Sequence, residues 1–233
     1  MEQQSYPENG QLQAATSAAL AKAFLNKVYL WMAVCMLLTA GVAAFTAQDV
    51  QSLMWVAENH VLVALGTLGM VVFMSFGANR LSSGALTVLL LAFAAVQGLL
   101  FGPLLVAYKM DSVAQAFACT AVMFGAMSIY GAVTRRNLTT MGRTLIMLLI
   151  GLLVASIVNI FWGNSFMDFI ISCAGVVIFA LFTAYDTQRL IELGTCEDEV
   201  VRRKGAVLGA LSLYLDFINL FLMLLRLFGG RDE

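Results

Sequence analysis

The sequence predicts an all-α, polytopic membrane protein with seven transmembrane helices, and two observations carry this prediction. Of the 233 residues, 61% are hydrophobic and 12% are charged, whereas a soluble domain averages about 45–50% apolar and about 25% charged residues. So few polar side chains cannot cover the surface of a soluble domain of this length. The apolar residues also gather in runs of about 20, the length that a helix needs to cross the hydrocarbon core of a bilayer.

Seven such runs follow one another along the chain, at residues 24–47, 61–79, 84–107, 113–133, 144–162, 166–190 and 205–228. The first run follows a polar segment, residues 1–21, that we expect to be a mobile cytoplasmic tail. The second run ends near Arg80, and Lys109 separates the third run from the fourth. Because the connections are short, residues 22–233 are expected to form a single transmembrane domain.

Charged segments also bound the last three runs. Arg135 and Arg136 separate the fourth run from the fifth. The sixth run begins near Asp168, whose charge is favourable at a helix N-terminus, and we expect it to end near Gly194 as a helix cap. The longest connection, Glu192–Lys204, carries acidic and basic side chains and is expected to be a solvated loop before the seventh run.

The distribution of Lys and Arg predicts the orientation in the membrane, because short cytoplasmic loops retain positive charge. Ten of the 13 Lys and Arg residues fall on the side that carries the N-terminus, and three fall on the other side. We therefore expect a cytoplasmic N-terminus and, after seven spans, a C-terminus outside.

Small residues at four-residue spacing predict where helices pack closely, because they let two helix backbones approach each other in lipid. Four rows of this kind occur: Ala94, Gly98 and Gly102; Ala121 and Gly125; Gly151 and Ala155; Gly205 and Gly209.

Asp216 is the clearest candidate for a functional residue. It lies near the middle of the seventh run, where an ionised side chain costs about 2.5–3.5 kcal/mol on insertion scales. Ser212 and Asn219 stand four residues before and three residues after it, so the three side chains form one polar stripe that must point into the bundle. The alternative is a structural role, in which Asp216 is neutral and hydrogen-bonded as part of the packing.

Asp186 is the second candidate, because it lies eight residues before Gly194, about 12 Å inside the cytoplasmic end of the sixth helix. The two carboxyls could meet in the cytoplasmic half of the bundle and would then titrate as a pair. The second span delivers Arg80 to the same side, where an ion pair with Asp186 is geometrically possible. Alternatively, Arg80 is a positive charge whose side chain reaches the membrane surface.

The sequence argues against an enzyme. Its single histidine, His60, is expected with Glu58 in a solvated loop, and no zinc, phosphate-loop or serine-hydrolase motif occurs. We therefore expect no cofactor and no bound metal site. The net charge of −1 and the short basic segments also make nucleic acid an unexpected partner. The lipid bilayer is the expected environment, and nothing in the sequence indicates an oligomeric state.

Four strings resemble the Bax inhibitor 1 family, in particular its bacterial members: QGLLFGPLLVAY, FGAMSIYGAVTRRNL, FTAYDTQRL and LGALSLYLDFINLFLMLLRLFG. The resemblance implies a seventh helix in the centre of a ring of six. It also implies a pH-sensitive calcium leak controlled by an aspartate pair on the sixth and seventh helices. Those aspartates match Asp186 and Asp216, and an arginine that pairs with one of them matches Arg80 by position.

The expected function is therefore a pH-regulated cation leak channel with Ca²⁺ as the transported ion, in the inner membrane of a bacterium. The resemblance implies an alternative as well, because some bacterial members restrain a membrane-bound ATP-dependent protease. In that case the chain would be a non-transporting regulator that binds such a protease or another membrane complex.

Overall fold

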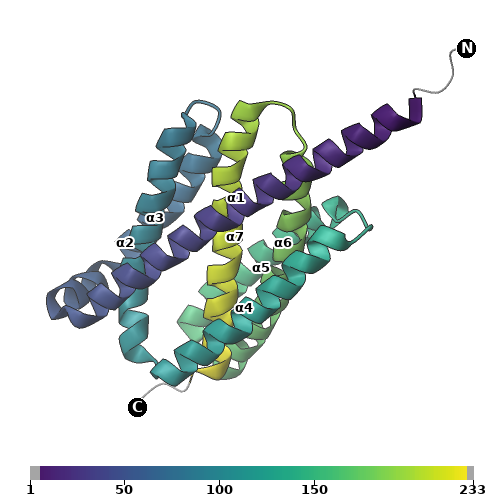
Figure 1. Cartoon of the computed structure of the whole chain (residues 1–233). Coiled ribbons are helices and arrows are strands. Elements are labelled where there is room, and N and C mark those ends of the chain that lie inside the picture. The colour runs from purple at the N-terminus through teal and green to yellow at the C-terminus, as the bar shows by residue number, and fades with distance from the viewer. Residues whose placement is uncertain (1–5, 230–233) are drawn as a thin grey trace, which may run out of the picture.

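The computed structural model describes residues 6–229 and, from residue 16 onward, their side chains. Within this range the chain forms seven helices, all long and apolar enough to span a membrane, which confirms the predicted fold class. They are α1 (Tyr6–Gln48), α2 (Val50–Gly77), α3 (Ser83–Ala107), α4 (Met110–Val133), α5 (Thr139–Trp162), α6 (Ser165–Gly194) and α7 (Glu199–Phe228). Short turns connect them, and α1 crosses the others obliquely (Figure 1).

Helix α7 lies in the centre of the bundle, as predicted (Figure 1). It packs against α1, α3, α4 and α6, while α2 packs on α3 and α1, and α5 packs on α6. In the most apolar stretch of α7, 72% of the residues are buried, compared with 11% in α2 and in α5. Helices α2 and α5 therefore present the largest share of their surface to lipid.

Successive helices from α2 to α7 run in opposite directions, so the turns after α2, α4 and α6 lie at one end of the bundle. We call it the basic end, and its turns comprise residues 78–82, 134–138 and 195–198. The Lys204 ammonium on α7 donates to the Ala78 carbonyl at 3.0 Å, which fixes the α2–α3 turn to the start of α7. The side chain of Gln188 on α6 accepts from the Leu138 amide at 2.7 Å and fixes the α4–α5 turn.

Helix α2 begins eleven residues earlier than the predicted span. The prediction of a loop around Glu58 and His60 is therefore wrong, because both residues belong to this helix. Asp49 caps the helix, because its side chain accepts a hydrogen bond from the Ser52 amide at 2.9 Å. Glu58 and His60 lie on exposed parts of the helix. Polar residues therefore extend this helix beyond its apolar run.

The connection predicted at Glu192–Lys204 is also wrong, because α6 continues to Gly194 and α7 begins at Glu199. The carboxylate of Asp198 accepts from the Val200 amide at 2.8 Å and caps α7. The acidic and basic residues thus start a helix. At the other end of α6, Asp168 lies in the first turn, as predicted.

The N-terminal segment predicted as a tail overlaps α1, which begins at Tyr6. Residues 1–5 lie outside the described part of the chain. The division at residue 22 between tail and membrane domain stays a prediction.

Two of the four small-residue rows lie at close helix contacts. Gly98 and Gly102 face α1, and a Cβ atom added to Gly98 would lie 2.7 Å from a side-chain carbon there. Gly209 lies directly against α6, where an added Cβ atom would overlap a leucine. By contrast, a Cβ atom added to Gly125 or Gly151 would have nothing within 4 Å, so the close packing predicted at these two rows is wrong. The spacing marks a smooth helix face but does not tell whether another helix covers it.

Candidate functional site

A hydrogen bond between two polar side chains joins α6 to α7 inside the bundle. The Ser212 hydroxyl on α7 donates to the carboxylate of Asp186 on α6. Asp186 is buried, with 8% of its surface exposed, and Ser212 is half-buried. The bond therefore lies in the interior of the bundle, about 12 Å along α6 from the basic end.

Close packing of the two helices makes this bond possible. Gly205 contacts Leu193 and Gly209 contacts Leu190, because neither glycine has a side chain that would hold the helices apart. These contacts set an antiparallel register that places residue 212 opposite Asp186. The positions of these residues in the sequence do not by themselves predict this pairing of α6 with α7.

The same register places Asp216 one helical turn, about 6 Å, deeper in the bundle than Ser212. Asp216 is buried, with 6% of its surface exposed, and it lies close enough to Asp186 for the two carboxyls to interact electrostatically. Among the residues that the structure describes, its Oδ2 atom has no hydrogen-bond partner. A buried carboxyl oxygen without a partner is costly, so this atom is a place where a proton, a water molecule or a cation would be stabilised.

Asn219, the third member of the predicted polar stripe, is half-buried and bonds to its own helix. Its side-chain amide donates to the Leu215 carbonyl at 2.8 Å. Of the three side chains in the stripe, Ser212, Asp216 and Asn219, the described residues show only Ser212 hydrogen-bonded to another helix.

Arg80 lies in the turn after α2, exposed at the basic end. Within the described residues, it forms no ion pair with Asp186 or Asp216. Instead, Arg189, three residues after Asp186 on the same helix, attracts the Asp186 carboxylate. The i to i+3 spacing in the sequence could have indicated Arg189. The role of Arg80 in the gate stays a prediction.

Several buried hydroxyls also lack a hydrogen-bond partner within the described part of the chain. They belong to Thr46 near the end of α1, Ser128 in the last third of α4 and Ser172 in the first third of α6. Because these helix positions differ in distance from the basic end, unpartnered polar atoms occur at several depths. Within the described part of the chain, no group of three or more His, Cys, Asp or Glu side chains could hold a metal ion.

Comparison with known proteins identifies the family of this chain. Residues 21–233 match the protein family described as Inhibitor of apoptosis-promoting Bax1. This chain belongs to the Bax inhibitor 1 family. The finding confirms the resemblance noted in its sequence.

Relatives of this Bax inhibitor 1 family chain occur in several bacteria. Inner membrane protein YbhL of Escherichia coli strain K12 is 41% identical over 214 residues, which cover 89% of this chain and 92% of YbhL. An uncharacterized protein of Deinococcus radiodurans is 43% identical over 213 residues, 91% of this chain and 92% of that protein. Another from Borreliella burgdorferi is 38% identical over 213 residues, 89% of this chain and 92% of its own length.

Sequence reasoning missed a second polar contact in this family member, which joins three helices. The fully buried Tyr214 on α7 has its hydroxyl 2.7 Å from the Thr39 hydroxyl on α1. Thr39 donates its own hydrogen to the Ala94 carbonyl on α3 at 2.8 Å, so Tyr214 is the donor to Thr39. The ring of Phe93 meets the Tyr214 ring edge-on, with the centroids 5.9 Å apart. These contacts hold α7 against α1 and α3, on the side away from α6.

Proposed function

We propose that this Bax inhibitor 1 family chain is a pH-regulated cation leak channel for calcium, and that Asp186 and Asp216 form its gate. The observation that carries the proposal is the unpartnered Asp216 Oδ2 atom, buried one turn from the bond between Ser212 and Asp186. It supports a gate because a carboxyl in this position changes its interactions strongly when it gains or loses a proton.

The gate works through charge repulsion between the two carboxyls. When they share a proton, α6 and α7 stay together through the Ser212 bond and the pathway is closed. When both are ionised, two like charges in a medium of low dielectric constant must separate or attract a cation. Calcium flux is therefore expected to rise as the pH rises.

The polar atoms available to line a pathway are few. Asp186, Asp216, Ser212 and the unpartnered hydroxyls of Ser128 and Ser172 lie at different depths of the bundle. A conducting pathway needs polar groups at several depths to replace the hydration of the ion. Most of the other buried side chains are apolar, and the buried threonines Thr120, Thr183 and Thr187 bond to carbonyls of their own helices. We therefore infer a slow leak.

Arg80 belongs to the proposed gate as a nearby positive charge at the basic end. Lys204 on α7 holds the turn that contains Arg80, so movement of α7 would carry this turn with it. In the ionised state the Arg80 guanidinium would stabilise the Asp186 carboxylate, together with Arg189.

Calcium flux into liposomes that contain an indicator dye tests the proposal directly. The purified protein is reconstituted and the flux is measured over a series of pH values. Asp186→Asn and Asp216→Asn keep the side-chain shape but cannot ionise, so each is expected to abolish the pH dependence. Asp111→Asn, at an exposed position in the first turn of α4, is the matched control and is expected to keep the wild-type profile. Wild-type pH profiles in both buried variants would contradict the proposal.

We also propose that the protein lies in the bacterial inner membrane with its N-terminus in the cytoplasm and its C-terminus outside. The name of the relative YbhL, an inner membrane protein, supports the location. The excess of Lys and Arg at the basic end supports the orientation. Reporter fusions in the turn at 134–138 and at the C-terminus test it, and a cytoplasmic signal from the C-terminal reporter would contradict it.

A non-transporting regulator of a membrane-bound ATP-dependent protease is the alternative function. The N-terminal part of α1 extends beyond the rest of the bundle, where a partner could reach it (Figure 1). Deletion of residues 1–15 separates the two functions, because a leak through the bundle should keep its flux. Loss of protease binding in this variant, with no calcium flux in the wild type, would favour the regulator.

A further inference from the structure

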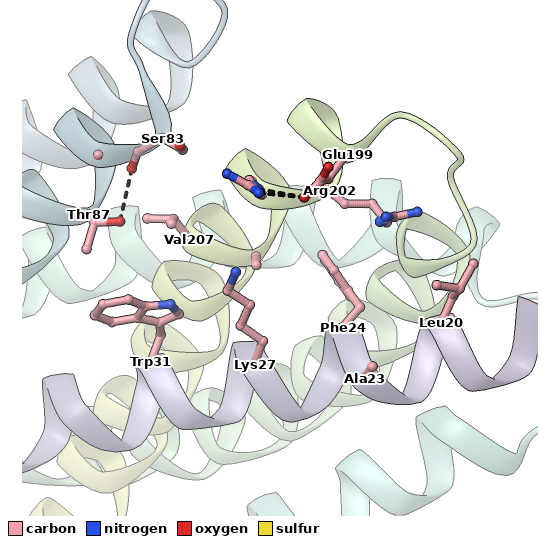
Figure 2. A pocket seen from close by; sticks show the side chains of 13 residues that line it. Leu20, Ala23, Phe24, Lys27, Trp31, Ser83, Thr87, Glu199, Arg202 and Val207 are labelled. Carbon is pink, nitrogen blue, oxygen red and sulfur yellow. Dashed lines mark hydrogen bonds and ion pairs between the residues drawn. The ribbon is translucent and has the colours of Figure 1, made fainter.

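A pocket of about 450 Å³ opens at the basic end, between α1, α3 and the start of α7 (Figure 2). It lies apart from Asp186 and Asp216, neither of which lines it. Its wall combines two kinds of surface, cationic and hydroxyl groups on one part and apolar side chains on another.

Three cationic side chains reach the pocket, namely Lys27 from α1 and Arg202 and Arg203 from α7. The one carboxylate that lines it, Glu199, is paired with Arg203 at 2.6 Å. Arg202 uses one nitrogen to bond the Cys196 carbonyl at 2.8 Å. For the Lys27 ammonium, the described residues provide neither a hydrogen bond nor an ion pair. The pocket therefore carries an excess of positive charge, and Lys27 is its uncompensated cation.

The start of α3 adds groups that favour an anion. Ser83 and Gly84, the first two residues of this 25-residue helix, line the pocket together with Thr87, whose hydroxyl donates to the Ser83 carbonyl at 3.0 Å (Figure 2). The first amides of a helix have no partner within the helix and carry its positive dipole end. These amides support the lysine and arginine side chains in attracting a negative charge.

The remaining wall is apolar. Leu20, Phe24 and Trp31 follow one another along α1 on the side that faces the pocket (Figure 2). Tryptophan prefers the boundary between the headgroups and the hydrocarbon of a membrane. A ligand that fits this pocket therefore has an anionic end and an apolar body.

We propose that this pocket binds an anionic phospholipid, with its phosphate between Lys27, Arg202 and the start of α3 and its acyl chains along Leu20 and Trp31. A soluble phosphate ester would use the cationic groups but leave the apolar wall exposed to water. The site does not depend on the cation leak, so its test has a separate readout.

Trp31 reports on the pocket directly. The two other tryptophans, Trp55 and Trp162, are exposed and lie near the opposite end, so W55F/W162F leaves Trp31 as the sole tryptophan, which is excited selectively over tyrosine. This variant is reconstituted in phosphatidylcholine vesicles, and Trp31 fluorescence is quenched with brominated phosphatidylglycerol or with brominated phosphatidylcholine. Each cationic side chain near an anionic headgroup strengthens binding by about fivefold. We expect about a tenfold preference for the anionic lipid, because Arg202 and Arg203 are partly committed within the protein.

Charge variants decide whether the preference arises in this pocket. Lys27→Gln with Arg202→Gln is expected to abolish the preference. The matched control, Arg135→Gln with Arg143→Gln, removes two exposed charges near the same end and should keep the preference. If the first pair of substitutions prevents folding, Lys27→Gln alone, at an exposed position, should lower the preference to about twofold.

Three outcomes would overturn the proposal. The first is equal quenching of Trp31 by the two lipids. The second is a preference that survives Lys27→Gln with Arg202→Gln. The third is loss of the preference when millimolar glycerol phosphate is added, which would assign the pocket to a soluble phosphate ester.

Discussion

Gly131→Ala tests the contact between α4 and α6 that supports the aspartate site. A Cβ atom at residue 131 would overlap the carbonyl oxygen of Ala184 and would lie 2.9 Å from the Ala184 Cα atom. Carbon atoms in contact are separated by about 3.5–4.0 Å, so the two helices would have to move apart by about 1 Å. Because the obstacle is backbone, no side-chain rotation relieves the overlap. Ala184 precedes Asp186 by two residues, and the displacement would reach the site.

Gly125→Ala is the matched control, six residues earlier on α4. Nothing lies within 4 Å of an added Cβ atom there. Alanine at this position should stabilise the helix by about 0.5–1 kcal/mol, whereas overpacking at Gly131 should cost about 1–3 kcal/mol. The two variants are therefore expected to differ by about 1.5–4 kcal/mol in the free energy of unfolding.

Equilibrium unfolding in mixed micelles of mild detergent and sodium dodecyl sulfate, followed by circular dichroism, measures this difference. The wild type should fall between the two variants. If Gly131→Ala is as stable as Gly125→Ala, α4 does not cross α6 as closely as described, and the placement of Asp186 that depends on this crossing is wrong.

Three further predictions concern the polar contacts and the gate. Ser212→Ala removes the bond from α7 to α6 and should lower the free energy of unfolding by about 1.5–3 kcal/mol. The same loss should raise calcium flux at acidic pH, and unchanged flux would contradict the proposed gate. Tyr214→Phe should cost about 1 kcal/mol, and Thr39→Val about 2 kcal/mol, because only the second leaves a buried hydroxyl without an acceptor. The reverse order in the micelle assay would contradict the described donor. Arg80→Ala should move the pH midpoint of calcium flux upward by about one unit, whereas Arg136→Ala should not, and equal shifts would exclude a specific role for Arg80.

Apolar runs and charge placement were sufficient to predict the helices, because lipid imposes a minimum length and an apolar surface on each span. They were not sufficient for the helix ends. Val50–His60 contains polar residues that are stable on an exposed helix once Asp49 caps it. The segment after Glu197 has the composition of a loop, yet Asp198 starts a helix there.

The sequence was sufficient to predict how far Asp186 lies from the helix end, but not which side chains it contacts. The position of Asp186 relative to Gly194 gave its distance from the helix end, since the rise per residue is fixed. The bond to Ser212 depends on how α7 slides along α6, which the glycine contacts with leucine side chains determine. The contact between Tyr214 and Thr39 joins residues 175 positions apart and leaves no local pattern in the sequence.

The central claim is that the carboxyls of Asp186 and Asp216 bind a proton over the pH range in which calcium flux changes. Infrared difference spectra of the protein in liposomes, recorded as the pH is varied, follow the carbonyl band of protonated carboxyl groups. We predict a band that Asp186→Asn and Asp216→Asn both alter and that grows with the same pH midpoint as the closing of calcium flux. A band that titrates with a different midpoint, or that is unchanged in both variants, would contradict the proposed gate.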